Sequence, residues 1–311
     1  MPRSCRRLIV LCLCLALHWC PLAWLAPRRG LLLSLGLAQS WHPASAETLC
    51  RDGSLVHLRG TEGDAFIVGV THLSNKSALL VREVVQTSSP DLVMVELDAS
   101  RVGLSTNTTK APSAGSAKED GNPLASMQRA ATQAATQLAA GVLKTGLELV
   151  YKVFEDKLQT PAGSEMITAI QEAGKLGVPV MLGDRPAQQT LTRLVEASQG
   201  TDLGQLEQDL AEAVPELRVG DGSTLGLQAL VDSATDQAMA RRLRRSFKAS
   251  APELFAALVG ERDEFMAASL ARAVRRGKRR LVAVVGSLHV QGLSESLAAQ
   301  TGLRPVDACV A

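Results

Sequence analysis

The sequence is poor in aromatic side chains, and its charges nearly balance. Phenylalanine, tryptophan and tyrosine make up only 3% of the 311 residues, and 33 Lys and Arg stand against 31 Asp and Glu. Proteins that hold single-stranded nucleic acid stack its bases on aromatic side chains in a positively charged groove. A formal charge of +2 supplies no such field. The two shortages argue against a nucleic-acid partner.

A long apolar run is also lacking after the first 46 residues, so we expect no transmembrane helix in the mature chain. Near the amino end, Arg3, Arg6 and Arg7 precede an apolar stretch from Leu8 to Leu17, which His18 interrupts. A positive start followed by a short apolar core is typical of a signal peptide rather than of a spanning helix.

A second leader pattern follows the first. Arg28 and Arg29 precede the apolar residues 30–38, and small residues end at Ala46, just before Glu47. This twin-arginine pattern predicts a leader over residues 1–46 that is cleaved to give a domain over residues 47–311. Two targeting patterns in tandem indicate an organelle lumen of the plastid or thylakoid type. A single secretory signal, and hence the secretory pathway or the extracellular space, is the alternative.

Cysteine becomes scarce once this leader is removed. Of six cysteines only Cys50 and Cys309 remain, one near each end of the mature chain. An oxidising compartment could join them, but nothing in the sequence fixes the distance between their Cα atoms.

Short apolar runs alternate with helical patterns in the remaining chain. Runs of this kind predict strands that are buried on both faces, joined by helices. We therefore predict one α/β domain with a mixed, mostly parallel sheet flanked by helices. Helical insertions are expected within residues 124–158 and 203–257, and a flexible loop over 105–123. The strands are expected at Ser54–Arg59, Ala65–Val70, Leu92–Val95, Val178–Leu182, Arg280–Val285 and Leu303–Val306. A helical stretch is expected over Pro252–Arg275 and a last helix over Leu293–Gln300, with His57 on the exposed face of the first strand.

Polar side chains follow several of the predicted parallel strands at the point where each strand ends. The carboxyl ends of parallel strands share one edge of a sheet, which is where α/β proteins place their ligands. We expect these residues to meet there. Two of them, His72 and His289, are the last residues of similar motifs, Gly69-Val-Thr-His72 and Gly286-Ser-Leu-His289. The others are Glu96, Asp98, Asp184 and Arg185.

The order of these motifs carries a resemblance to a known family. Gly-x-x-His is followed by Pro-Asp-x-Val-x-Val-Glu-Leu-Asp, then Gly-Asp-Arg, then Glu261-Arg262-Asp263, and finally Val-Val-Gly-x-x-His. Each motif alone is common, but five in this order resemble the TraB family, which includes pheromone-shutdown proteins and the TIKI metalloproteases. The resemblance covers most of residues 65–292 and implies peptidase activity for the TIKI branch only.

The resemblance leads to a metal-dependent hydrolase that acts on a peptide or a small molecule. His72 and His289 would be imidazole ligands of a divalent metal such as Zn, Mn or Co, and Glu96 either a third ligand or the base. Arg185 and Arg262 would bind an oxyanion or a substrate carboxylate. Four further carboxylates are expected either to orient the metal ligands or to serve as additional ligands: Asp98, Asp184, Glu261 and Asp263.

Two other interpretations remain open. A histidine after a strand is often only a hydrogen-bonded core residue, and Glu96 could form a buried ion pair with Arg185 or Arg262. The same pocket could also belong to a non-catalytic protein that binds a peptide or haem. Haem would require a further ligand, and Tyr151 is the only tyrosine. The Arg241–Arg245 run is expected on a solvated helix face.

Overall fold

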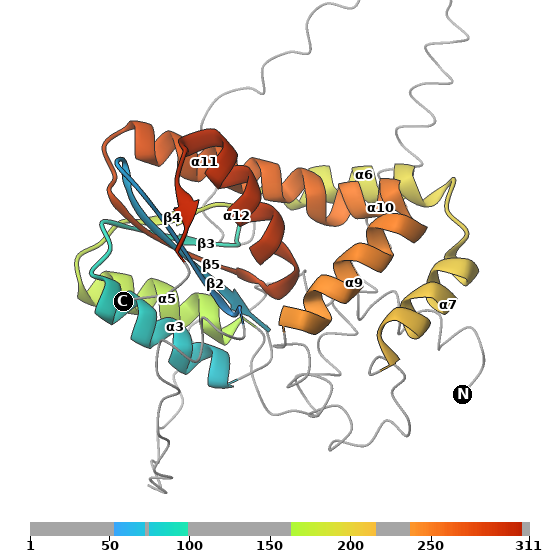
Figure 1. The fold of residues 1–311 in the computed structure, drawn as a ribbon, viewed down its shortest axis with the longest axis horizontal. Helices are drawn as coiled ribbons and strands as arrows, with labels where there is room; N and C mark the ends of the chain where they lie inside the picture. The colour runs from blue at the N-terminus through green and yellow to red at the C-terminus, as the bar shows by residue number, and fades with distance from the viewer. Residues whose placement is uncertain (1–52, 72–74, 99–162, 216–236, 307–311) are drawn as a thin grey trace, which may run out of the picture.

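The structure, a computed structural model, describes residues 53–71, 75–98, 163–215 and 237–306 (Figure 1). The predicted leader, the loop at 105–123 and the helical stretch at 124–158 lie outside these ranges, as do His72, Cys50 and Cys309. None of the helices in the described ranges combines the length and the apolar character that a bilayer-spanning segment needs.

The described strands form one sheet of six, in the order β4-β3-β5-β2-β1-β6. β3 is parallel to both β4 and β5, and β5 is parallel to β2, whereas β1 is antiparallel to β2 and to β6. The predicted mixed, mostly parallel sheet is therefore confirmed. The strands are β1 (Leu55–Gly60), β2 (Gly63–Val70), β3 (Leu92–Val95), β4 (Val180–Leu182), β5 (Arg280–Gly286) and β6 (Arg304–Pro305).

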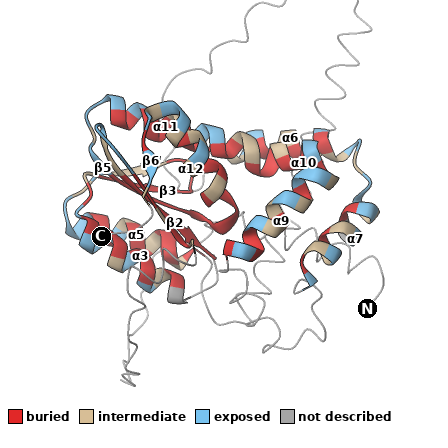
Figure 2. Ribbon diagram, viewed as in Figure 1, coloured by how far each residue is buried: buried red, intermediate tan, exposed pale blue. Residues whose placement is uncertain are grey.

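Helices cover both faces of this sheet (Figure 1). α3 (Asn75–Ser88) and α5 (Ser164–Lys175) lie on one face, and α11 (Glu261–Arg275) and α12 (Ser287–Thr301) on the other. Successive strand side chains enter opposite cores, because Ile67 packs beneath α11 and α12 while Val68 packs against α3 and α5. Burial on both faces explains why these strands are continuous apolar runs (Figure 2).

The remaining helices lie to one side of these layers (Figure 1). They are α6 (Ala187–Ser198), α7 (Leu203–Ala213), α9 (Gln237–Ser250) and α10 (Pro252–Phe255). A π-helical turn, η2 (Ala256–Gly260), joins α10 to α11. Single π turns inside a longer helix are often found at functional sites. This one immediately precedes the Glu-Arg-Asp motif.

Two sequence-based expectations are wrong. α12 begins at Ser287, directly after β5, rather than at Leu293, so His289 lies in the first turn of a helix. His57 does not lie on an exposed strand face but is 1% exposed. It stacks on Phe66, and its Nε2 lies 2.8 Å from Oδ1 of Asp64.

Candidate functional site

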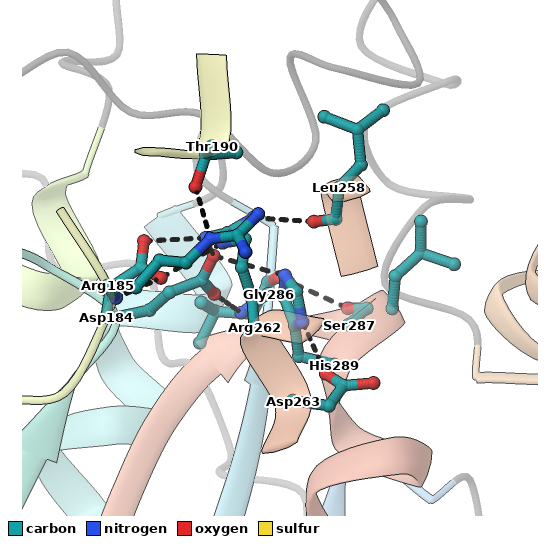
Figure 3. Close-up of polar contacts among 12 residues, drawn as sticks. Asp184, Arg185, Thr190, Leu258, Arg262, Asp263, Gly286, Ser287 and His289 are labelled. Atoms are coloured by element: carbon teal, nitrogen blue, oxygen red, sulfur yellow. Dashed lines mark hydrogen bonds and ion pairs between the residues drawn. The ribbon is translucent and has the colours of Figure 1, made fainter. Parts of the chain in front are cut away.

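Charged side chains converge at the carboxyl ends of three neighbouring strands (Figure 3). Glu96 follows β3 directly, and Asp184 is the second residue after β4. His289 follows β5, and Arg262 and Asp263 enter from the first turn of α11. All five residues are buried. The sequence places them together because parallel strands end at one edge and α11 covers the sheet beside it.

Arg262 lies at the centre of the cluster and is 2% exposed. Its Nε and Nη2 donate to the two carboxylate oxygens of Asp184, at 3.0 and 2.9 Å. Nη2 also donates to Oε1 of Glu96. Burial alone would lower the pKa of Arg262, but the two carboxylates outweigh it and raise that pKa above its usual value. The guanidinium is therefore a fixed positive charge between two buried carboxylates.

The main chain at the start of α12 holds the other oxygen of Glu96. The amide of Gly286 donates to Oε2 at 2.6 Å. Amides at a helix start have no partner within the helix, so they commonly bind a carboxylate. Glu96 is thus fixed through both oxygens, and Nε2 of His289 lies 3.3 Å from Oε1.

His289 is fully buried, and a second carboxylate fixes its ring. Nδ1 lies 2.6 Å from Oδ1 of Asp263. A carboxylate only accepts, so Nδ1 carries the hydrogen and Nε2 is the nitrogen that faces Glu96. Burial by itself lowers the pKa of His289, and Arg262 lowers it further. The carboxylates of Glu96 and Asp263 nevertheless raise it to about 9.

Arg185 forms a second cluster next to the first. Its Nε donates to Oγ1 of Thr190 at 2.8 Å, and its Nη1 donates to Oε2 of Glu261 at 2.5 Å. Nη2 donates to the carbonyl of Ala257 at 2.5 Å, within the π-helical turn. Arg193 also binds Glu261. A cation just before α6 is unfavourable for the helix dipole, and Glu261 is the carboxylate that compensates it.

The π-helical turn thus supports both buried arginines. Nη2 of Arg185 donates to the carbonyl of Ala257. Nη1 of Arg262 donates to the carbonyl of Leu258 at 3.1 Å (Figure 3). A π turn shifts the main-chain hydrogen-bond register and makes carbonyls available to side chains. Glu261 has a lowered pKa, first because Arg193 donates to it and then because of Arg185, with burial opposing.

Most of the site residues predicted from the sequence are brought together. Asp98 is also buried. The amide of Asp184 donates to the carbonyl of Leu97, the residue before Asp98, at 3.1 Å. His72 lies outside the described residues, two positions beyond Val70, whose register partner is Gly286. Ser287 binds the carbonyl of Val70 at 3.2 Å, so β2 ends beside the start of α12.

Sequence reasoning missed one residue of the cluster, Arg244. It was expected on a solvated face, but its side chain is only 14% exposed, and Nη1 lies 2.8 Å from Oδ2 of Asp263. A sequence signal did exist. Ala240, Arg244 and Phe247 follow one another at helical spacing, and both neighbours on that stripe are buried.

The donor set fits a metal ion in part. A histidine whose Nδ1 is held by a carboxylate and whose Nε2 faces a second carboxylate has the arrangement common among metal ligands. Across the described ranges, however, no group of three or more His, Cys, Asp or Glu side chains is placed to hold an ion. A complete ligand set would need a residue from outside these ranges, where His72 lies.

The fold and this edge cluster define an α/β protein with a buried ionic site at the carboxyl ends of its parallel strands. The family model for the TraB/PrgY/gumN family matches residues 55–300, and the chain belongs to that family. The predicted resemblance is confirmed.

The chain is also similar to a protein of Methanocaldococcus jannaschii that is described as uncharacterized. The two are 30% identical over 238 residues, which are 75% of this chain and 53% of the relative. The chain thus spans about half the length of the curated relative it matches.

Proposed function

We propose that the protein is a metal-dependent hydrolase with a peptide-like substrate. The observation that carries the proposal is the orientation of His289, whose Nδ1 is held by Asp263 and whose Nε2 faces Glu96 at 3.3 Å. His289 and His72 would be ligands of a divalent cation such as Zn, Mn or Co. Imidazole suits these metals, and the two similar motifs begin beside each other, where Val70 of β2 pairs with Gly286 of β5.

A bound cation would supply Lewis acidity that polarises the scissile carbonyl. The chain itself would supply the base. Oε1 of Glu96 lies 3.3 Å from Nε2, and the Gly286 amide and Arg262 fix the orientation of this carboxylate. A base in a fixed orientation transfers a proton without first reorganising, which is the property that general-base catalysis requires. Glu96 as a third ligand is the other role compatible with these contacts.

The contacts of the two arginines support an orienting role. Arg262 donates to Glu96, Asp184 and a carbonyl, and Arg185 donates to Thr190, Glu261 and another carbonyl. These partners fix the orientation of both guanidinium groups. We therefore assign Arg262 to holding the carboxylates and keep substrate binding by either arginine as a prediction.

The pairing of charges within the cluster favours a second candidate, a non-catalytic protein that binds a peptide or a small ligand at this edge. A site whose charges are balanced internally can be a rigid frame for binding as well as for turnover. For either function, the leader pattern leads us to propose an organelle lumen as the place of action.

The test is the metal content of the purified full-length protein, by elemental analysis before and after incubation with Zn, Mn or Co. We expect about one ion per chain, and loss of it in His289→Ala and in His72→Ala. His57→Ala is the matched control, because His57 is also buried and also bound to a carboxylate, that of Asp64. Hydrolysis of a peptide mixture then distinguishes the enzyme from the binding protein. Absence of metal under every loading condition would overturn the metal-dependent function.

A further inference from the structure

Arg244 reaches the site from a helix outside the sheet layers. It lies in α9, where its neighbours Arg241 and Arg245 are exposed. Its side chain turns inward instead, and the guanidinium carbon lies 4.9 Å from the centre of the Phe255 ring. An aromatic face beneath a guanidinium restricts its orientation. Arg244 is thus held on one side by apolar packing.

On its other side, Arg244 contacts two groups that flank His289. Nη1 lies 2.8 Å from Oδ2 of Asp263 and donates to the carbonyl of Leu288 at 2.9 Å. The two carboxylate oxygens of Asp263 have different partners. Oδ1 binds Nδ1 of His289, and Oδ2 faces Arg244. One guanidinium therefore contacts both the carboxylate that holds the imidazole and the main chain just before it.

The glycine three residues after His289 makes this arrangement possible. A Cβ added at Gly292 would lie 2.0 Å from Oδ2 of Asp263 and 2.2 Å from Nη2 of Arg244. The ion pair therefore occupies the space that any other residue at this position would fill. This places Arg244 and Asp263 against the same turn of α12 that carries His289.

We propose that Arg244 is a positioning residue, which orients Asp263 so that His289 keeps its hydrogen on Nδ1 and presents Nε2 to Glu96. The inference rests on the proposed function where Nε2 is taken as the metal ligand. Carboxylates that orient metal-binding histidines contribute about 10- to 100-fold in metal affinity. Arg244 acts on the ligand through such a carboxylate.

The experiment compares Arg244→Met with Arg245→Met in the full-length protein, because Arg245 is an exposed arginine on the same helix. Zinc affinity is measured by competition with a chromophoric chelator. Arg244→Met should weaken zinc binding by about 10- to 100-fold, and Arg245→Met should leave it unchanged. Methylguanidinium added to Arg244→Ala should restore affinity, which loss of packing alone would not allow. Unchanged affinity in Arg244→Met would overturn the inference.

A second readout needs no metal. Proton–nitrogen spectra of metal-free protein with labelled histidine should show a slowly exchanging Nδ1 hydrogen on His289, which exchanges faster in Arg244→Met. If the parent binds no zinc but this change occurs, the proposed function fails and the positioning role stands. If Arg244→Met does not fold, Arg244→Lys decides, because an ammonium cannot reproduce the planar fork. Zinc affinity and hydrogen exchange both equal to the parent's in Arg244→Lys would overturn the role.

Discussion

Arg262 donates to Glu96 in the interior of the protein, although 166 residues separate the two in the chain. The same guanidinium also binds both oxygens of Asp184. The positive charge of Arg262 thereby links α11 to the end of β3 and to the segment after β4. Because removal of a buried partner leaves uncompensated charge, this side chain should matter to stability as well as to the site.

Replacing Arg262 with Met keeps most of the side-chain volume but leaves Glu96 and Asp184 without their cation. We expect the free energy of unfolding in urea to fall by about 3–5 kcal/mol. Arg279→Met is the control, because Arg279 forms an ion pair with Glu62 in which both side chains are more than half exposed. That control should cost less than about 1 kcal/mol. Equal losses in the two variants would contradict the central role of Arg262.

Glu96→Gln separates charge from shape. The amide oxygen of Gln can still accept from Gly286, so the variant should fold, whereas the basicity of the side chain is lost. We expect hydrolysis to fall by a factor of about 10²–10⁴, with part of the metal retained if Glu96 is chiefly the base. Initial rates on a cleaved peptide and elemental analysis check both results. Full activity in this variant would eliminate Glu96 as the base.

Gly292→Ala tests the close approach of Asp263 and Arg244 to α12. Alanine normally stabilises a helix interior by about 1 kcal/mol relative to glycine. Here its Cβ would meet the two side chains at 2.0 and 2.2 Å, so we expect a lower melting temperature instead. Gly174→Ala in α5 is the matched control, because no atom lies within 4 Å of its Cβ position. Stabilisation by both substitutions would show that the ion pair does not occupy this space.

Glu172 should make stability sensitive to acid. Hydrogen bonds from Lys175 and Gln86 lower its pKa below 4.5, with burial opposing them. Because the folded pKa is the lower one, the stabilisation is complete above 4.5 and disappears as the pH falls through the folded value. The difference in unfolding free energy between the parent and Glu172→Gln should therefore shrink as the pH falls. A difference that does not change with pH would be inconsistent with this pairing.

The strands and the edge at which they end could be predicted because burial on both faces leaves a clear apolar pattern. Ile67 and Val68 enter different cores, so neither position tolerates a polar side chain. Polar residues directly after such runs must then lie at the sheet edge, which is how Glu96, Asp184 and His289 were found. The helix start at Pro252 was also predicted correctly, because proline is favoured in the first turn of a helix.

The partners within the site could not be predicted, because they depend on tertiary packing. Nothing local shows that Arg262 rather than Arg185 binds Glu96, or that Arg244, once it lies on the buried stripe of its helix, pairs with Asp263. Gly292 lowers the local helix propensity, so the sequence suggested a later start for α12 than packing against α11 and β2 produces. Similarly, His57 is buried against Phe66, its register partner on β2, a contact that local sequence does not reveal.

Anomalous X-ray scattering from crystals of the full-length protein, grown with zinc, tests the central claim most directly. The account predicts one strong peak about 2.0–2.1 Å from Nε2 of His289, with His72 as a further ligand. Crystals of His289→Ala should lack that peak. A peak at any other place, or none at saturating zinc with Nε2 still facing Glu96, would contradict the assignment of this edge as a metal site.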